Sequence, residues 1–243
     1  MGRTCYDYYW YFNFLHINFM DQKIMKIKKI IVFSVVFVLI IFLGFAPSST
    51  QKTLAIYWGD LGLKMVDAGV IDREKVEGLY KERYNLSEKD KEIIYGNHNG
   101  DIMITSENSG MMLNMLWAFG LANKNPILEN GPMMDSRYGG AENFASTSGW
   151  TLAKGNVMDH YSMHKFLILT SEQQILVEKV TKNVYRPCCK NSTYFPDCNH
   201  GMAMLGLLEL KASQGANEAD MYKTALEAND LWFPKVEKSG CSV

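Results

Sequence analysis

The stretch that most constrains the fold is residues 106–125, which read SENSGMMLNMLWAFGLANKN. On a helix these residues would place apolar side chains on nearly every face, and a helix that is apolar all round has to be buried. The Asn125-Pro126 step should end it, because the residue before a proline avoids the helical conformation. The sequence therefore predicts a domain built around one central helix, whose apolar residues are Met111, Met112, Met115, Leu116, Phe119 and Leu121.

Other segments begin with residues that favour a helix start and continue with apolar residues at helical spacing. Asp72 is a good N-cap, Ser87 is followed three residues later by Asp90, and Thr170 with Gln173 makes a capping-box pattern. Asp197 and Asn217 are further N-cap candidates. We therefore predict seven helices, over residues 53–69, 72–80, 87–94, 106–125, 171–184, 198–213 and 217–229.

Two segments do not fit this helical pattern. Residues 101–105, DIMIT, are either a short strand or an extended entry to the central helix. Residues 131–155 are rich in Gly, Ser, Asn and Pro, and such long irregular loops are often functional. They contain neither the G-x-S-x-G pattern of serine hydrolases nor a phosphate-binding loop. The predicted fold is mostly α: a single domain of about seven helices with one long irregular Gly-rich loop.

The front of the chain has the build of a secretory signal or a signal anchor. Lys26, Lys28 and Lys29 precede an uncharged apolar run of 16 residues, 30–45, and small residues follow it. Because positive charge stays on the cytoplasmic side, everything after this run should be exported. We expect either a single-pass membrane protein anchored through residues 30–47, or a secreted or periplasmic protein after cleavage near residue 48. The sequence leaves both open.

These features divide the chain into three parts. Residues 1–24 are aromatic and patternless, and we interpret them as a mis-called start before Met25 or a tail without fixed structure. Residues 25–48 are the signal peptide or membrane anchor, and residues 49–243 the exported α-helical domain. After residue 48 there remain 20 basic and 24 acidic residues. Such a mildly acidic domain lacks the basic face that nucleic acid would require.

The clearest candidate site lies in residues 185–205, YRPCCKNSTYFPDCNHGMAML. Cys188 and Cys189 are adjacent in a connector between two predicted helices, Cys198 stands at the start of the second helix, and His200 follows it. Thiolates and imidazole are ligands for zinc, for copper(I) and, in some combinations, for haem. The sequence therefore predicts a metal site formed by Cys188, Cys189, Cys198 and His200, with zinc or copper ahead of haem.

Two other interpretations of the same cysteines stay open. Outside the cytoplasm thiols tend to oxidise, so a disulfide from Cys188 or Cys189 to Cys198, with the third cysteine paired to Cys241, would give a stapled structural or interaction domain. Alternatively, the helix start would lower the pKa of Cys198. Cys198 would then be the nucleophile, and Cys189 the resolving thiol, of an extracytoplasmic thiol–disulfide oxidoreductase.

A second cluster occurs in residues 158–165, MDHYSMHK. His160 and His164 are four residues apart and would share a face of a helix, with Met158 and Met163 beside them. Imidazole and thioether groups suit copper, so these histidines are candidate additional ligands. No glutamate follows His160 in the H-E-x-x-H pattern, which disfavours a zinc protease.

Residues 186–222, with the cysteines followed by DCNHGMAMLGLLELKASQGANEADMYK, resemble the end of small exported bacterial proteins that carry a PCYCGC motif. They are also similar to the thiol segment of the cytochrome c maturation oxidoreductases. The resemblance implies metal binding or thiol exchange on an exported protein. We expect a binding or sensing module without catalytic turnover, whose protein partner the sequence does not indicate.

Overall fold

The computed structural model describes residues 28, 31, 52–83, 85–96 and 98–234. The chain divides into two units, Met1–Thr50 and Gln51–Val243, and almost all described residues belong to the second. The predicted signal or anchor, its cleavage, the start at Met25, and Cys5 and Cys241 lie outside the described residues. Within the described residues, no helix combines the length and the apolar character needed to span a bilayer.

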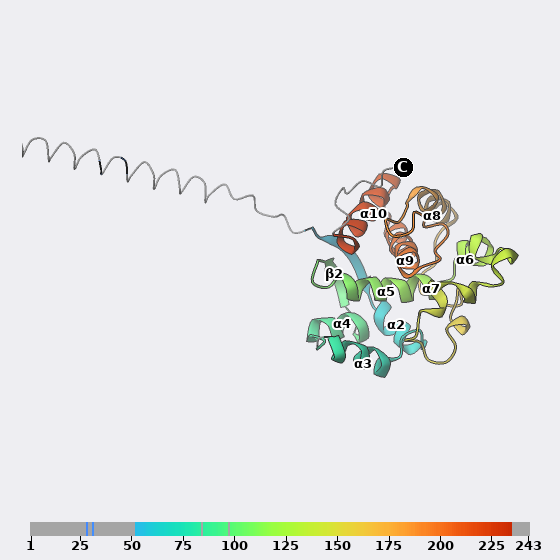
Figure 1. The fold of residues 1–243 in the computed structure, drawn as a ribbon, viewed down its shortest axis with the longest axis horizontal. Helices are drawn as coiled ribbons and strands as arrows, with labels where there is room; N and C mark the ends of the chain where they lie inside the picture. Colours follow the sequence, from blue (N-terminus) through green and yellow to red (C-terminus); the bar gives the residue numbers. More distant parts are fainter. Residues whose placement is uncertain (1–27, 29–30, 32–51, 84, 97, 235–243) are drawn as a thin grey trace, which may run out of the picture. The chain divides into compact units, whose positions relative to one another are not determined.

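The second unit is mostly helical, as predicted (Figure 1). Six of the seven expected helices are present, the one expected over residues 53–69 is present only in its second half as α2, and two short helices, α6 and α7, follow the central helix. Two strands, β1 (Leu54–Gly59) and β2 (His98–Ile104), form an antiparallel sheet. The helices are α2 (Leu61–Asp67), α3 (Arg73–Arg83), α4 (Glu88–Tyr95), α5 (Ser109–Ala122), α6 (Pro126–Asn130), α7 (Ala145–Ser148), α8 (Ser171–Asn183), α9 (Asn199–Ser213) and α10 (Glu218–Trp232).

The single helix expected over residues 53–69 is wrong, because its first half is strand β1. Along β1, Leu54, Ile56 and Trp58 are buried while Ala55 and Tyr57 are exposed, which is the two-residue period of a strand. Pairing with β2 supplies its backbone hydrogen bonds, and Gly59, at φ +61°, ends it in a conformation that favours glycine. The apolar spacing fitted both a helix and a strand, and the partner strand decided between them.

The predicted helix starts are largely confirmed. Ser87 and Asp90 form a complete capping box at α4, and Thr170 and Gln173 form one at α8. Asn217 accepts a hydrogen bond from a backbone N–H in the first turn of α10. Residues 131–155 are irregular, as expected, with the short 3₁₀ turns η1 (Pro132–Met134), η2 (Ser136–Tyr138) and η3 (Ala141–Asn143), and the one-turn helix α7.

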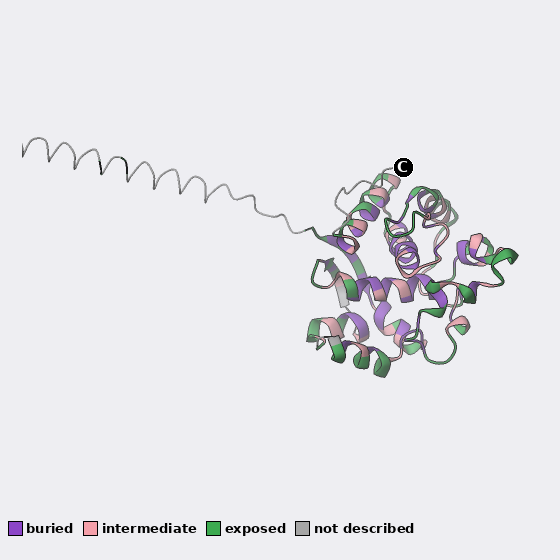
Figure 2. Cartoon of the chain, in the orientation of Figure 1, coloured by how far each residue is buried: buried purple, intermediate pink, exposed green. Residues whose placement is uncertain are grey.

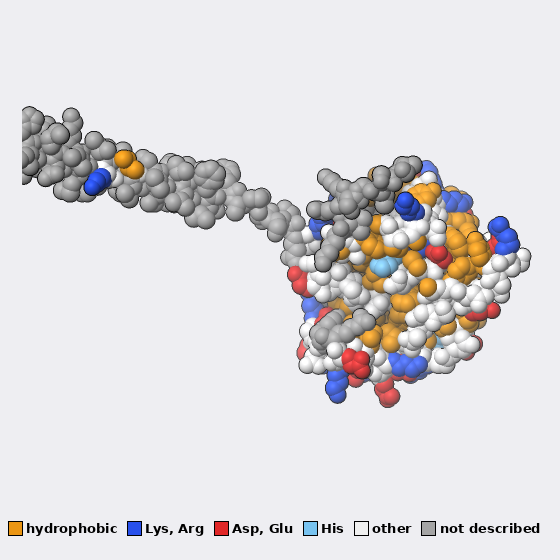
Figure 3. Space-filling model, viewed as in Figure 1, with side chains coloured by type: hydrophobic (Ala, Val, Ile, Leu, Met, Phe, Trp, Pro, Cys, Tyr) orange, Lys and Arg blue, Asp and Glu red, His pale blue; other side chains and the backbone are white. Residues whose placement is uncertain are grey.

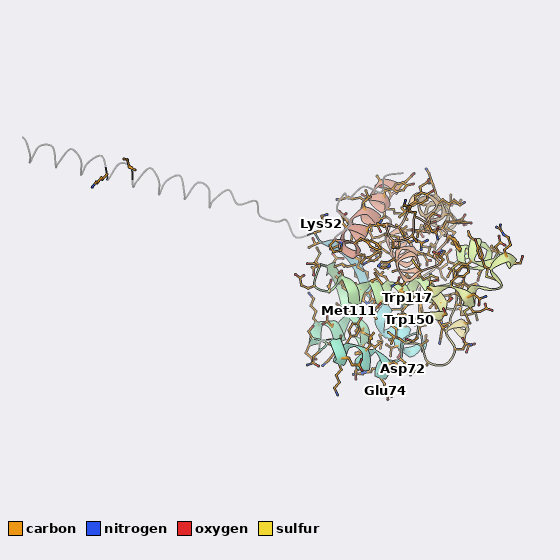
Figure 4. All side chains as sticks on the ribbon, in the orientation of Figure 1. Lys52, Asp72, Glu74, Met111, Trp117 and Trp150 are labelled. Atoms are coloured by element: carbon orange, nitrogen blue, oxygen red, sulfur yellow. The ribbon has the colours of Figure 1, made fainter. Side chains whose placement is uncertain are left out.

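Helix α5 is the buried centre of the fold, as its sequence predicts, and it packs against α9 (Figure 2). Two glycines allow the two backbones to touch. A Cβ on Gly120 would overlap the Met202 carbonyl oxygen, and a Cβ on Gly206 would lie 2.6 Å from the Leu116 carbonyl oxygen. The crossing therefore fixes where α9 begins relative to α5. The ring of Trp117 on α5 also meets that of Trp150 edge to face, with 5.1 Å between the centroids (Figure 4).

Helix α9 also carries an acidic side chain into the core. Glu209 has no solvent exposure, and its Oε2 accepts a 2.6 Å hydrogen bond from the Asn123 side chain. Burial raises the pKa of Glu209 to about 8, against the opposing effect of Asn123 and Asn125. The carboxyl group is therefore neutral at pH 7, which removes the large cost of an unpaired buried charge.

We predict that Gly120→Ala destabilises the fold by about 1–3 kcal/mol, because the added methyl group forces α5 and α9 apart. Gly110 is the matched control, since it lies in the same helix and a Cβ there would meet no atom within 4 Å. Gly110→Ala should be neutral or stabilising by up to ~1 kcal/mol. Urea unfolding measures both variants, and equal stability of the two would contradict the close crossing.

Glu209 gives a second prediction, on the pH dependence of stability. Between pH 4.5, the ordinary value, and about 8, the unfolded chain has lost the Glu209 proton and the folded chain has kept it. The free energy of unfolding therefore falls as the pH rises through this window. Above the window the contribution of Glu209 no longer changes with pH. Glu209→Gln should remove this slope and gain on the order of 4 kcal/mol over the wild type between pH 5 and 9.

Chemical denaturation at several pH values measures this difference. Glu82→Gln, at an exposed position on α3, serves as the control and should follow the wild type. A Glu209→Gln curve parallel to that of the wild type at every pH would show that the carboxyl ionises normally inside the fold.

Candidate functional site

The connector between α8 and α9 is organised around one buried cation, Arg186, which is 1% exposed. Its Nη2 donates to the carbonyl oxygens of Ser192 and Phe195, at 3.1 and 2.7 Å, and its Nε donates to that of Asn191 at 3.2 Å. Its Nη1 forms a 2.7 Å ion pair with Asp197 Oδ1. These protein groups thus replace the water that the guanidinium loses on burial, and the loop is folded around the guanidinium.

The same Nη1 atom also donates to the sulfur of Cys198, at 2.9 Å. Cys198, and not Asp197 as expected, is the N-cap of α9, and Asp197 is instead drawn to Arg186. Burial by itself would raise the pKa of Cys198, but the His200 side chain, the Gly201 backbone N–H and Arg186 outweigh burial and lower the pKa below its ordinary value. Cys198 is therefore the described cysteine whose thiolate form the site favours.

Gly201 makes room for this contact. It lies in the first turn of α9, where a Cβ would overlap Nη1 of Arg186 and would come within 2.8 Å of its Cζ. Any larger residue would therefore push the guanidinium away from Cys198. The sequence shows only a glycine inside a predicted helix, which ordinarily lowers helix stability.

The three described cysteines are free thiols whose sulfurs converge. The sulfurs of Cys188 and Cys189 are 3.8 Å apart, and each lies within 4.8 Å of the Cys198 sulfur. Partial burial and the neighbouring Cys198 raise the pKa of Cys188 to about 12. The connector therefore presents one thiolate-favouring sulfur from the helix start and two thiols from an exposed turn.

Two sets of potential metal ligands result from this arrangement. One consists of Cys188, Cys198 and His200, and the other of Cys189, Asp197 and Cys198, with the ligand atoms of each set within 4.8 Å of one another. In the first set, the His200 ring lies 4.5 Å from the Phe233 ring and 6.2 Å from that of Trp232, between centroids. The end of α10 therefore helps to position the imidazole.

The predicted contributors His160 and His164 lie in a different cluster. His160 Nδ1 is 3.0 Å from His164 Nε2, and His160 Nε2 is 3.0 Å from the Lys154 carbonyl oxygen. Burial, and then the adjacent His160, lower the pKa of His164. The two imidazoles bond to each other, and in the described part of the chain neither belongs to a group of three potential ligands. They follow a 3₁₀ turn, so they do not lie together on a helix face, the arrangement in which their spacing was considered.

Sequence reasoning located the four ligand candidates but missed the residues that hold them together. Arg186 was not singled out, although a cation near cysteines is a feature of thiol sites that favour the thiolate. Asp197 was interpreted only as a helix cap. Gly201, three residues after Cys198, leaves space for the Arg186 side chain, and this role is apparent only in the structure.

Comparison of the chain with protein-family models, with curated proteins and with solved structures finds no match in any of the three.

On the face that Figure 3 shows, acidic and basic side chains are interspersed around the edge of the domain.

We predict that Gly201→Ala raises the pKa of Cys198 toward its ordinary value, because the added methyl group displaces the guanidinium. The pH dependence of Cys198 alkylation by iodoacetamide, followed by peptide mass spectrometry, measures this change. Gly78→Ala on α3, where a Cβ would meet nothing within 4 Å, is the control and should leave the profile unchanged. A folded Gly201→Ala protein with the wild-type profile would show that Arg186 does not act on this thiol.

Proposed function

We propose that this protein binds a metal ion, zinc or copper, through Cys188, Cys198 and His200. The observation that carries the proposal is the convergence of these three ligand atoms within 4.8 Å of one another, from a loop and from a helix start. Sulfur and imidazole are the donors that these two ions take in proteins, whereas calcium and magnesium take oxygen.

The spacing of the donors supports this proposal. A tetrahedral ion with bonds of about 2.3 Å to sulfur holds two sulfurs ~3.8 Å apart. The sulfurs of Cys188 and Cys189 already have this separation, and the other donors need to close in by about 1 Å from their upper limit of 4.8 Å. Cys189 is the candidate fourth donor, because its sulfur lies 3.8 Å from that of Cys188 and within 4.8 Å of that of Cys198.

The exposure of the site to solvent favours reversible binding, in which the ion is taken up and released. Cys188 and Cys189 are exposed, while Cys198 and His200 are half-buried. The coordination shell of a structural zinc site is closed by four protein ligands, whereas here the two adjacent thiols are exposed to solvent. This supports a protein that takes up and releases an ion, as a carrier or a sensor without turnover. Haem is a weaker candidate, because the described ligand atoms converge on a single small centre.

The location of the protein is part of the proposal. The cationic cluster and apolar run of residues 26–45 favour a bacterial protein that is exported or anchored in the membrane, with the helical domain outside the cytoplasm. The resemblance of residues 186–222 to exported bacterial proteins with a PCYCGC motif supports the same placement. Such a domain would meet metal ions that enter from outside the cell.

Metal analysis of the purified full chain tests the proposal, with about one zinc or copper ion per chain as the expected result. His200→Ala and Cys198→Ser should each weaken binding by more than ~100-fold, because even residues that only orient a ligand contribute ~10–100-fold. Competition with a chromophoric chelator under reducing conditions measures the affinity.

His164→Ala is the matched control for His200→Ala, since it removes an imidazole of the separate His160–His164 pair. Its affinity should equal that of the wild type. The proposal fails if the wild type binds neither zinc nor copper(I), or if the His200 and His164 variants bind equally well.

A further inference from the structure

The cysteine cluster contains two sets of potential metal ligands, and the two sets differ in what lies between their ligand atoms. They share only Cys198: Cys188 and His200 complete the first set, and Cys189 and Asp197 complete the second. A sulfur atom has more than one lone pair and can bind two ions at once. By its donor atoms alone, the cluster could therefore hold two ions that share the Cys198 sulfur.

A cationic side chain already bridges the second set. Nη1 of Arg186 donates to Asp197 Oδ1 at 2.7 Å and to the Cys198 sulfur at 2.9 Å. The other carboxylate oxygen, Oδ2, accepts a 2.8 Å hydrogen bond from Asn191. A zinc ion bound to the same two atoms would lie about 2.1 Å from the oxygen and ~2.3 Å from the sulfur, so it would compete with Nη1 for both. The permanent charge of the guanidinium also repels such an ion.

The fold keeps the guanidinium in this position. Arg186 is buried, and its Nε and Nη2 donate to three backbone carbonyl oxygens of the connector between α8 and α9. A Cβ on Gly201 would lie 2.3 Å from Nη1, so the glycine in the first turn of α9 leaves the space that the guanidinium fills. A metal ion in the second set would have to displace a side chain around which the loop is folded.

The first set has no such competitor. Among the contacts of the described residues, no hydrogen bond joins a cationic side chain to Cys188 or to His200. Arg186 is hydrogen-bonded to this set only through the Cys198 sulfur. A hydrogen bond from an outer group to a ligand is usual in metal sites, where such partners orient the ligand. The same guanidinium therefore suits an ion in the first set and opposes one in the second.

We infer that Arg186 is a built-in cation that limits the cysteine cluster to one ion and directs this ion to the first ligand set. The inference rests on the proposed function, because it concerns the ion that the cluster is proposed to bind. Asp197 is then not a ligand, and its carboxylate is the counter-ion of Arg186. Arg186 is a positioning residue, since it acts on the ion through its neighbours.

Loss of the guanidinium should have an effect that damage to the fold would not produce. Without it, Cys189, Asp197 and Cys198 become available together, and sulfur and carboxylate oxygen are both donors that zinc accepts. A folded protein that lacks the guanidinium should therefore gain an ion, whereas a merely structural role of Arg186 predicts a loss of binding.

The test counts zinc ions per chain by native mass spectrometry, in which the charge-state distribution also reports whether the protein is folded. It uses the full chain under reducing conditions, with Cys5 and Cys241 replaced by Ser. Arg186→Gln should bind one ion more than the parent, two in place of one. Lys190→Gln is the matched control, because it removes an exposed cation from the same connector and leaves the guanidinium in place. Its count should equal that of the parent.

A second variant decides the inference if Arg186→Gln does not fold. Asp197→Asn keeps an oxygen atom for Nη1 and removes the carboxylate that an ion in the second set would need. Its affinity for zinc, measured by competition with a chromophoric chelator, should fall by less than about tenfold, because even residues that orient a ligand directly contribute ~10–100-fold. A larger fall would show that Asp197 binds the ion, and it would overturn the inference.

The difference between Arg186→Gln and its parent tests this inference, and the count of the parent tests the proposed function. One ion in each protein, or two in the parent, would overturn the inference and leave the proposed function standing. No ion in the parent and one in Arg186→Gln would refute the proposed function and support the role of Arg186. No ion in either folded protein would refute both.

Discussion

The candidate site depends on the burial of the Arg186 guanidinium. A cation taken out of water is stable only where fixed groups replace its hydration, and here three carbonyl oxygens, the Asp197 carboxylate and the Cys198 sulfur do so. Those groups belong to residues 191–198, the part of the connector that leads into α9. The interaction therefore shapes the loop and helps to lower the pKa of the Cys198 thiol.

The helix that presents Cys198 is positioned by a separate constraint, the close crossing of α5 and α9. Gly120 and Gly206 let the two backbones touch, so α9 cannot slide without a clash. Large apolar residues around the crossing fill the core, and the neutral Glu209 is hydrogen-bonded within it. The start of α9 is therefore held by the core, whereas the turn of Cys188 and Cys189 is exposed to solvent.

Much of this organisation was predictable from the sequence. The buried helix α5 follows from an unbroken apolar surface, and the starts of α4, α8 and α10 follow from their capping residues. These are local signals. Strand β1 was mistaken for a helix because its partner, β2, comes more than 40 residues later and its apolar spacing suits both structures.

The candidate site, too, could be predicted from the sequence only where its residues are neighbours along the chain. The proximity of Cys188, Cys198 and His200 was predicted because these residues are close in sequence. The separation of the His160–His164 pair from them, and the placement of Arg186 against Cys198, depend on packing between distant segments. Residue spacing carries no information on such contacts.

The protein holds the three sulfurs in different ways, and this difference affects how a bound ion would be transferred to an acceptor molecule. An ion held there would be bound by two donors at the start of α9, Cys198 and His200, and by the exposed turn of Cys188 and Cys189. An acceptor molecule could displace the donors of this turn one at a time while Cys198 and His200 kept their bonds. The ion would then pass on without ever being released into solvent, and the helical scaffold would stay still throughout.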